Sequence, residues 1–259
     1  MRQLLLFAAL GIAPVLIGQS SFVNEGREPV RVVPAPEPTP PPQPISPEMR
    51  GDISMARKDF RQAIDYYRSI DPPSHVIFNK IGIAFHQLAE LESAKKYYEK
   101  SAKLKPDYAE AVNNLGTIFY ASKSYRRAVR QYSRALRLAP NSASIYSNLG
   151  TAWFARKNYQ KATAAYQKAL SLDPEVFEHR STNGVLLQER TVEERAKFHF
   201  YLAKTYAKAG MADRALLYMR KCLEEGFKDR QKFVEEPDFA NLQQIPEFQE
   251  LLQYQPRVL

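Results

Sequence analysis

The stretch from residue 75 to residue 176 decides the fold, because it repeats itself. Residues 75–108 are HVIFNKIGIAFHQLAELESAKKYYEKSAKLKPDY, residues 109–142 are AEAVNNLGTIFYASKSYRRAVRQYSRALRLAPNS, and residues 143–176 are ASIYSNLGTAWFARKNYQKATAAYQKALSLDPEV. The three segments have the same length and align without a gap. A constant period of about 34 residues is typical of a protein in which each unit packs on its neighbours in the chain.

Side chains of the same kind recur at the same place in each unit. In the first half of the unit the matched columns are Phe78, Val112 and Tyr146, then Ile81, Leu115 and Leu149, then Gly82, Gly116 and Gly150, then Phe85, Phe119 and Trp153. In the second half they are Ala94, Ala128 and Ala162, then Tyr98, Tyr132 and Tyr166, then Ser101, Ala135 and Ala169, then Pro106, Pro140 and Pro174. This pattern predicts two antiparallel helices in each unit, the second of which ends at the proline.

The columns also predict how the helices pack. We expect each glycine to face the alanine twelve residues later, so that the two backbones approach closely, and the aromatic columns to fill the space towards the next pair. Asp107 and Asn141 follow two of the prolines and are expected to cap the next unit.

These columns resemble the signature of the tetratricopeptide-repeat family, a helix-turn-helix unit of about 34 residues with small, aromatic and proline positions. The resemblance covers about two thirds of the chain. It implies an all-α fold, a right-handed superhelical solenoid of antiparallel helix pairs. It also implies a protein that binds other proteins and is not an enzyme.

Two further units flank the regular ones at different offsets. Gly51 precedes Gly82 by slightly less than one period, and Ala203 follows Gly150 by more than one and a half periods. We therefore expect a solenoid over residues 48–259, with units at about 48–74, 75–108, 109–142, 143–176 and 196–226 and a capping region at 227–259. An insertion at 177–195 ends in a predicted capping box at Thr191–Glu194. It is interpreted either as a segment that contacts a partner or closes the groove, or as a tolerated loop or short extra helix.

The N-terminal region has the composition of an exported protein. An apolar run over residues 4–18 follows Arg2 and is too short for an ordinary membrane-spanning helix, so residues 1–20 are predicted to be a signal peptide, cleaved or retained as an anchor. Nine prolines between residues 28 and 47 predict an extended linker over residues 21–47. The expected location is the periplasm or another exported site in the cell envelope. Retention of the segment would instead anchor the protein in the inner membrane, and only then is membrane contact expected.

The first helices are expected to line a concave groove that binds the partner. Asn114 and Asn148 share a column with Lys80 and Tyr201, and in some family members asparagines at this place hold the backbone of an extended peptide, although they also occur there as plain consensus. The full set of predicted groove residues shares one helical face: Asn79, Lys80, Ile83, His86, Asn113, Asn114, Thr117, Tyr120, Ser147, Asn148, Thr151, Phe154 and Tyr201.

Charge suggests a second surface. Lysine and arginine outnumber aspartate and glutamate by 37 to 28, which gives a formal net charge of +9 and favours acidic partners. Four arginines recur along one predicted helix and form a candidate surface for anions, or simply a solvated outer face; they are Arg126, Arg130, Arg134 and Arg137.

Chemistry-bearing motifs are few. Cys222 falls in the column of Ser101, Ala135 and Ala169 and is predicted to be a small buried thiol. The four histidines show no metal-ligand spacing, and the chain has neither a phosphate-binding glycine loop nor a nucleophile elbow. We therefore expect no metal, no cofactor and no catalytic residue.

Together these features predict a non-catalytic adaptor in the cell envelope that binds a protein partner through an extended peptide or a helix, and that does not bind nucleic acid. Two alternatives stay open at this stage. One is an accessory subunit of an envelope enzyme or of a secretion or pilus assembly complex. The other is a membrane-tethered structural protein that binds anionic surfaces through its arginine-rich face.

Overall fold

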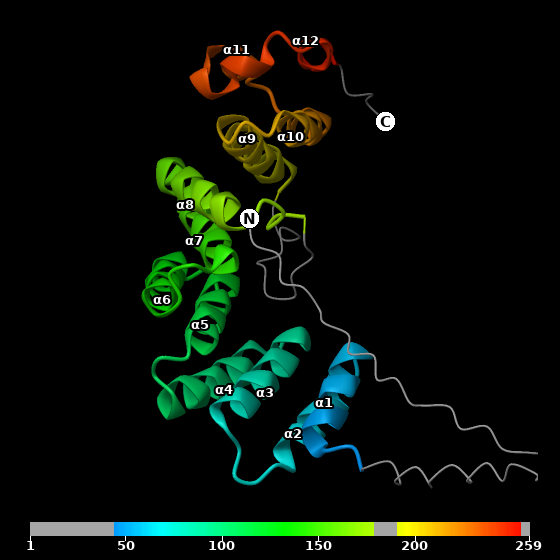
Figure 1. Ribbon diagram of the computed structural model, residues 1–259, viewed down its shortest axis with the longest axis vertical. Coiled ribbons are helices and arrows are strands. Elements are labelled where there is room, and N and C mark those ends of the chain that lie inside the picture. Colours follow the sequence, from blue (N-terminus) through cyan, green and yellow to red (C-terminus); the bar gives the residue numbers. More distant parts are fainter. Residues whose placement is uncertain (1–43, 179–190, 255–259) are drawn as a thin grey trace, which may run out of the picture. The chain divides into compact units, whose positions relative to one another are not determined.

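The computed structural model describes residues 44–178 and 191–254, and within these ranges every regular element is a helix (Figure 1). In chain order the elements are α1 (Pro47–Ala56), α2 (Phe60–Arg68), α3 (His75–Gln87), α4 (Leu91–Leu104), α5 (Ala109–Ala121), α6 (Tyr125–Leu138), α7 (Ala143–Ala155), α8 (Tyr159–Leu172), α9 (Val192–Lys208), α10 (Ala212–Glu224), α11 (Gln231–Glu235), the 3₁₀ helix η2 (Pro237–Leu242) and α12 (Pro246–Gln253). The predicted all-α class is confirmed. The predicted signal peptide, nearly all of the linker and the middle of the insertion lie outside the described residues.

Consecutive helices form hairpins that stack in sequence order. The pairs α1–α2, α3–α4, α5–α6, α7–α8 and α9–α10 pack within themselves, and α2 on α3, α4 on α5, α6 on α7 and α8 on α9 join one hairpin to the next. Each hairpin therefore buries its apolar face on its neighbours in the chain, as expected of a solenoid. Within the described ranges, no helix combines the length and the apolar character needed to cross a membrane.

The turn inside each hairpin has the same backbone conformation. A residue with positive φ follows the first helix in every case: Lys58 (62°), Ala89 (59°), Lys123 (56°), Lys157 (60°) and Gly210 (74°). The next residue donates its amide to a carbonyl five positions earlier, as Glu90 does to Phe85 at 2.9 Å and Met211 to Tyr206 at 3.0 Å. The flanking hairpins thus share the turn of the regular repeats despite their different offsets.

Each repeat glycine lies against a tyrosine of the second helix. A Cβ atom added to Gly82 would come within 2.6 Å of the Tyr98 ring, and one added to Gly116 within 2.6 Å of the Tyr132 ring. The nearest side chain to each glycine is thus the ring sixteen residues later, and the expected approach to the alanine column stays a prediction. In the α9–α10 hairpin both members of the pair change, and buried Ala203 and Met219 stand at the equivalent positions.

The predicted helix caps are partly corrected. Helix α5 begins after Tyr108 and α7 after Ser142, whose hydroxyl accepts the amide of Ile145, so Asp107 and Asn141 are not the caps we expected. The capping box at Thr191–Glu194 is confirmed at the start of α9.

The C-terminal segments add a second apolar layer to the last hairpin. Helix η2 packs on α9 and α12 packs on α10, and the rings of Phe233 and Phe239 lie 5.1 and 5.8 Å from the ring of Phe200. Cys222 of α10 is fully buried, as predicted, and burial raises the pKa of its thiol. A thiol held in this state is a packing group rather than a nucleophile.

Candidate functional site

A chain of buried asparagine side chains joins the first helices of three hairpins. The Asn148 amide nitrogen donates to Asn113 Oδ1 at 3.1 Å, Asn113 donates to Asn114 Oδ1 at 3.3 Å, and Asn114 donates to Asn79 Oδ1 at 3.0 Å. These four side chains are between 2% and 7% exposed. Because buried amides need partners, the chain couples α3, α5 and α7 in one register.

Two threonines of the predicted groove are also buried in internal bonds. The hydroxyl of Tyr132 donates to Thr117 Oγ1 at 3.2 Å, and that of Tyr166 donates to Thr151 Oγ1 at 3.3 Å. Each threonine in turn donates to a backbone carbonyl of its own helix. The threonine column therefore fixes the second helix of a hairpin to the first.

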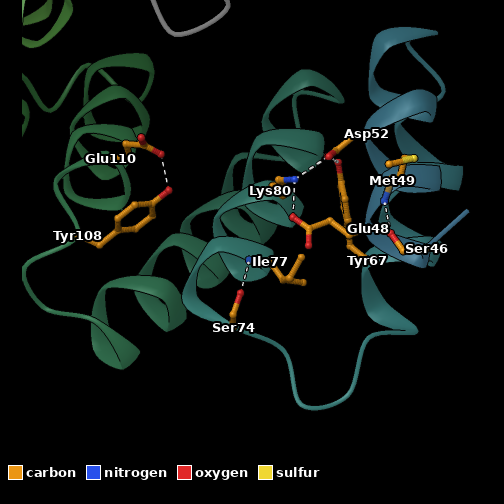
Figure 2. Close-up of polar contacts among 10 residues, drawn as sticks. All are labelled: Ser46, Glu48, Met49, Asp52, Tyr67, Ser74, Ile77, Lys80, Tyr108 and Glu110. Carbon is orange, nitrogen blue, oxygen red and sulfur yellow. Dashed lines mark hydrogen bonds and ion pairs between the residues drawn. The ribbon is translucent and has the colours of Figure 1, made fainter. Parts of the chain in front are cut away.

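Lys80 is paired with acids of the first hairpin. Figure 2 shows its ammonium between two carboxylates of α1, 2.7 Å from Glu48 Oε1 and 2.8 Å from Asp52 Oδ1. The hydroxyl of Tyr67 donates to the same Asp52 oxygen at 2.7 Å. Burial alone would lower the pKa of Lys80, but its bonds to Asp52 and Glu48 raise it above the ordinary value. This lysine thus links α3 to α1.

The other predicted groove residues remain partly accessible. Ile83, His86, Tyr120 and Ser147 are half-buried along α3, α5 and α7, whereas Phe154 is 5% exposed. Burial lowers the pKa of His86, so its imidazole is neutral at neutral pH. The predicted groove residues thus include two kinds of side chain: buried ones that form hydrogen bonds within and between hairpins, and others that are partly exposed.

Open space adjoins the turns of the third and fourth hairpins. A hollow of about 630 Å³ is lined by four aromatic side chains, Tyr120 and Tyr125 of one hairpin and Phe154 and Tyr159 of the next. The rings pair within each hairpin at 5.3 Å, Tyr120 with Tyr125 and Phe154 with Tyr159. We call this space the repeat-junction hollow. It contains two residues that the sequence nominated, Tyr120 and Phe154.

Charged side chains surround the repeat-junction hollow. Lys123 and Lys157, the positive-φ residues of the two turns, lie on one side, and Glu193, Glu194 and Lys197 from the start of α9 lie on the other. The Lys197 ammonium stands 4.4 Å from the centre of the Tyr159 ring. The sequence interpretation missed Tyr125, Tyr159 and the turn lysines, although each pair recurs at the period of the repeat.

Tyr201 of α9 joins the last hairpin to this region. Its ring stacks on Tyr159 at 4.7 Å and lies edge-on to Phe154 at 5.9 Å. On its other side it borders a second cavity of about 420 Å³, together with Phe200 and Phe227. Tyr201 therefore belongs to an aromatic cluster with Phe154 and Tyr159 rather than to the asparagine chain with which its column aligned it.

The arginine stripe lies on the second helix of the third hairpin. Arg126, Arg130 and Arg137 of α6 are exposed and Arg134 is half-buried. Within the described residues, no group of histidine, cysteine, aspartate or glutamate side chains is arranged to hold a metal ion.

Family models identify the repeats. A model described as "Tetratricopeptide repeat" matches residues 76–108, a second described as "TPR repeat" matches residues 116–155, and a third described as "Tetratricopeptide repeat" matches residues 143–176. Residues 76–176 are tetratricopeptide repeats. The predicted family is thereby confirmed, and its members are in general scaffolds for protein–protein interaction rather than enzymes.

Several solved structures are similar to this chain. A crystal structure of MamA is 24% identical over 68% of this chain and 93% of its own, with a TM-score of 0.48, and MamA 41-end from Desulfovibrio magneticus RS-1 is 22% identical over 68% and 90%, with a TM-score of 0.47. The APC/C hetero-tetramer Cut9–Hcn1 is 18% identical over 80% of this chain and 35% of its own, with a TM-score of 0.51. This last likeness supports the helical repeat fold. A search of curated proteins found no match.

Proposed function

We propose that the protein is a non-catalytic scaffold of the cell envelope that binds a segment of a partner protein in the repeat-junction hollow. The observation that carries the proposal is the hollow of about 630 Å³ that four aromatic side chains line at the junction of two repeats. Tetratricopeptide repeats serve as interaction scaffolds, and this hollow offers a recessed aromatic surface to a partner.

Its side chains suit a peptide or a helix. Aromatic rings provide large contact areas with little loss of conformational freedom, and a tyrosine hydroxyl can bond a peptide group at the same time. Lysines and glutamates at the edge add polar contacts of both signs, as in the rim of ordinary protein interfaces. An aromatic or aliphatic anchor on the partner would fill the hollow while its neighbours contact the rim.

The asparagine chain has a supporting role in this proposal. A ligand that used Asn114 or Asn148 would first have to break amide bonds that connect neighbouring hairpins. A buried, fully bonded network stabilises one arrangement of its members, so the chain would hold α5 and α7 at the spacing that forms the hollow. We therefore place the partner at the aromatic residues and assign the amides to preorganisation.

The envelope location rests on the N-terminal sequence. The apolar run over residues 4–18 and the prolines that follow it support export with a spacer ahead of the repeats. Mass spectrometry of the native N-terminus tests this part alone, and a mature protein that still begins at Met1 and stays in the cytoplasm would contradict it.

Site-specific crosslinking tests the binding part. A photoreactive amino acid replaces half-buried Tyr125 at the hollow or, as the control, exposed Leu217 of α10. We expect one protein to be crosslinked from position 125 and not from position 217, and its crosslinked segment, made as a peptide, to bind the purified chain. The Tyr125→Ala variant should then lose most of that affinity while the Leu217→Ala variant keeps it. Equal crosslinking from both positions, or equal affinity of both variants, would contradict the proposal.

A further inference from the structure

The two middle repeats contain no acidic side chain over a long stretch. Between Ala111 and Leu172 there is neither aspartate nor glutamate, while ten lysines and arginines occur there, so the formal charge of this stretch is +10. The net charge of the whole chain is +9, which means that the other residues together sum to −1. The positive charge of the protein is thus concentrated in the α5–α8 region.

Helix α6 carries five of these ten charges, and four of them share its outer side. Arg126, Arg130, Arg134 and Arg137 fall within an arc of about 80°, given about 100° of rotation per residue. The fully buried residues Ala128, Tyr132 and Ala135 lie on the other side of the same helix. The apolar face of α6 is therefore fully used in packing, and the arginine face is directed to solvent.

Neutral groups hold these arginines in place. A guanidinium nitrogen of Arg134 donates to the carbonyl of Pro106 at 3.1 Å, and one of Arg137 donates to the carbonyl of Ser133 at 3.3 Å. In the part of the chain that the structure describes, no carboxylate forms an ion pair with any arginine of α6, whereas Lys80, Lys204 and Arg214 each pair with acids. Two of the four arginines thus bond neutral carbonyls, and no described ion pair neutralises the charge of the stripe.

The preceding hairpin extends the stripe. Lys96, Lys100 and Lys103 of α4 occupy the positions one repeat before Arg130, Arg134 and Arg137, and all three lysines are exposed. The bond from Arg134 to the carbonyl of Pro106 joins α6 to the segment just beyond the end of α4. We call the four arginines and these three lysines the basic face.

We propose that the basic face binds an extended acidic segment of a protein. Successive arginines four residues apart on α6 are separated by about 6 Å along the helix axis. Alternate side chains of an extended peptide recur about every 6.6 Å on one side, so glutamates at every second position match Arg126, Arg130 and Arg134 within about 1 Å, while Arg137 lies about 4.5 Å beyond Arg134 and adds charge outside this register. Each guanidinium can bond a carboxylate through two nitrogens, which favours carboxylates in this register.

A membrane surface fits the basic face less well. Interfacial helices insert an apolar side into the lipid, but the apolar side of α6 is buried in the solenoid, and the sole large exposed apolar residue described on this helix is Leu138. The proposal is independent of the repeat-junction hollow, because the arginines of the stripe project from the second helix and are not among the residues that line it.

Fluorescence anisotropy with a labelled peptide of alternating glutamate and serine tests the proposal on the full chain. We expect binding at about 50 mM salt that weakens markedly at about 200 mM, and no binding of the matched peptide with glutamine in place of glutamate. The variant R126Q/R130Q/R137Q should bind the acidic peptide about tenfold more weakly, since it loses three exposed charge pairs. R126K/R130K/R137K should keep the charge and recover part of the loss.

A charge-matched control separates the effect of the arginine stripe from the effect of the protein's net charge. The variant R57Q/K208Q/K228Q removes three exposed cations from other elements and should bind like the wild type, as should Tyr125→Ala at the hollow. Equal weakening in both triple variants, or equal binding of the glutamine peptide, would overturn the proposal. So would tighter arginine-dependent binding to phosphatidylglycerol vesicles or to oligodeoxythymidine than to the acidic peptide. Circular dichroism of each variant establishes that it is folded.

Discussion

The close contact between the repeat glycine and tyrosine allows a sharp test at Gly82. A Cβ atom there would lie 2.6 Å from two ring atoms of Tyr98, whereas ordinary van der Waals contact begins at about 3.4 Å, so the ring would have to recede by about 0.8 Å. Tyr98 is 1% exposed and is enclosed by its own hairpin and the next. Because a packed core resists such a shift, Gly82→Ala should be destabilising.

The expected magnitude combines two opposing effects. Forcing an extra methyl group into a packed core costs about 1–3 kcal/mol. Replacing glycine by alanine inside a helix stabilises by about 1 kcal/mol, because the backbone of the unfolded chain loses freedom. The net loss of stability for Gly82→Ala should therefore be up to about 2 kcal/mol, and it should lie in the upper part of that range because the ring is tightly enclosed.

The α9–α10 hairpin suggests the compensating change. There Ala203 and Met219 stand at the positions of Gly82 and Tyr98, and both are completely buried. A flexible methionine can make room for the alanine methyl group where a planar ring cannot. No hydrogen bond to the Tyr98 hydroxyl is found among the described residues, unlike for Tyr132, so Tyr98→Met removes ring volume alone.

A double-mutant cycle separates the interaction between residues 82 and 98 from the effect of each single change. Its free energies come from urea unfolding monitored by far-UV circular dichroism. Each single change should destabilise, and G82A/Y98M should be more stable than the sum of the single effects predicts, by at least about 1 kcal/mol. If Gly82→Ala were as stable as the wild type or more stable, the gain in helix propensity would outweigh any steric cost, which would contradict the prediction. If the two changes were additive, the contact between them would carry no strain, and the reasoning would be refuted.

Three further perturbations test other parts of the structure. Asn113→Ala removes both a donor to Asn114 and an acceptor in the buried amide chain, and should lower the free energy of unfolding in urea by about 2–4 kcal/mol. Gly210→Ala places a side chain at φ 74° with nothing within 4 Å of it, so it should cost about 1 kcal/mol of backbone strain and lower the melting temperature. Burial lowers the pKa of His86 in the folded protein, so as the pH falls the imidazole is protonated in the unfolded chain before it is protonated in the folded one. The stability that neutral His86 contributes is therefore complete above about pH 6.5 and is lost as the pH falls below it. The His86→Gln variant should show a smaller decline in melting temperature between about pH 7 and pH 5.

The helical repeat could be predicted because each column reports one constraint. Glycine is required where the ring of a tyrosine meets the backbone, and this requirement recurs at Gly82, Gly116 and Gly150. The sequence shows that these positions are constrained, but it does not show which side chain imposes the constraint. For this reason the contact with the tyrosine ring was not predicted, although the period and the helices were predicted correctly.

The candidate site was harder to predict, because the same face of the first helices carries two kinds of side chain, those that bond neighbouring hairpins and those that remain accessible. Asn113, Asn114 and Asn148 are polar residues on an apolar background, which from sequence alone indicates a ligand. In the structure they lie within 3.0–3.3 Å of one another or of Asn79. Whether an amide bonds a ligand or another amide depends on the distance between neighbouring hairpins, and no single repeat encodes that distance.

The second helices show which of their side chains can differ between repeats. Ala128 and Tyr132 of α6 recur in the other regular repeats because packing fixes them, and the position of Ala135 is always a small residue. The solvent-facing position of Arg126, by contrast, is glutamate in α4 and glutamine in α8. Side chains on that face can change without disturbing the stack, so the absence of acids between Ala111 and Leu172 is not required by the fold. In a domain where acids and bases otherwise nearly balance, such a charge distribution is best explained by what the face binds, and the acidic peptide is the ligand that its spacing fits.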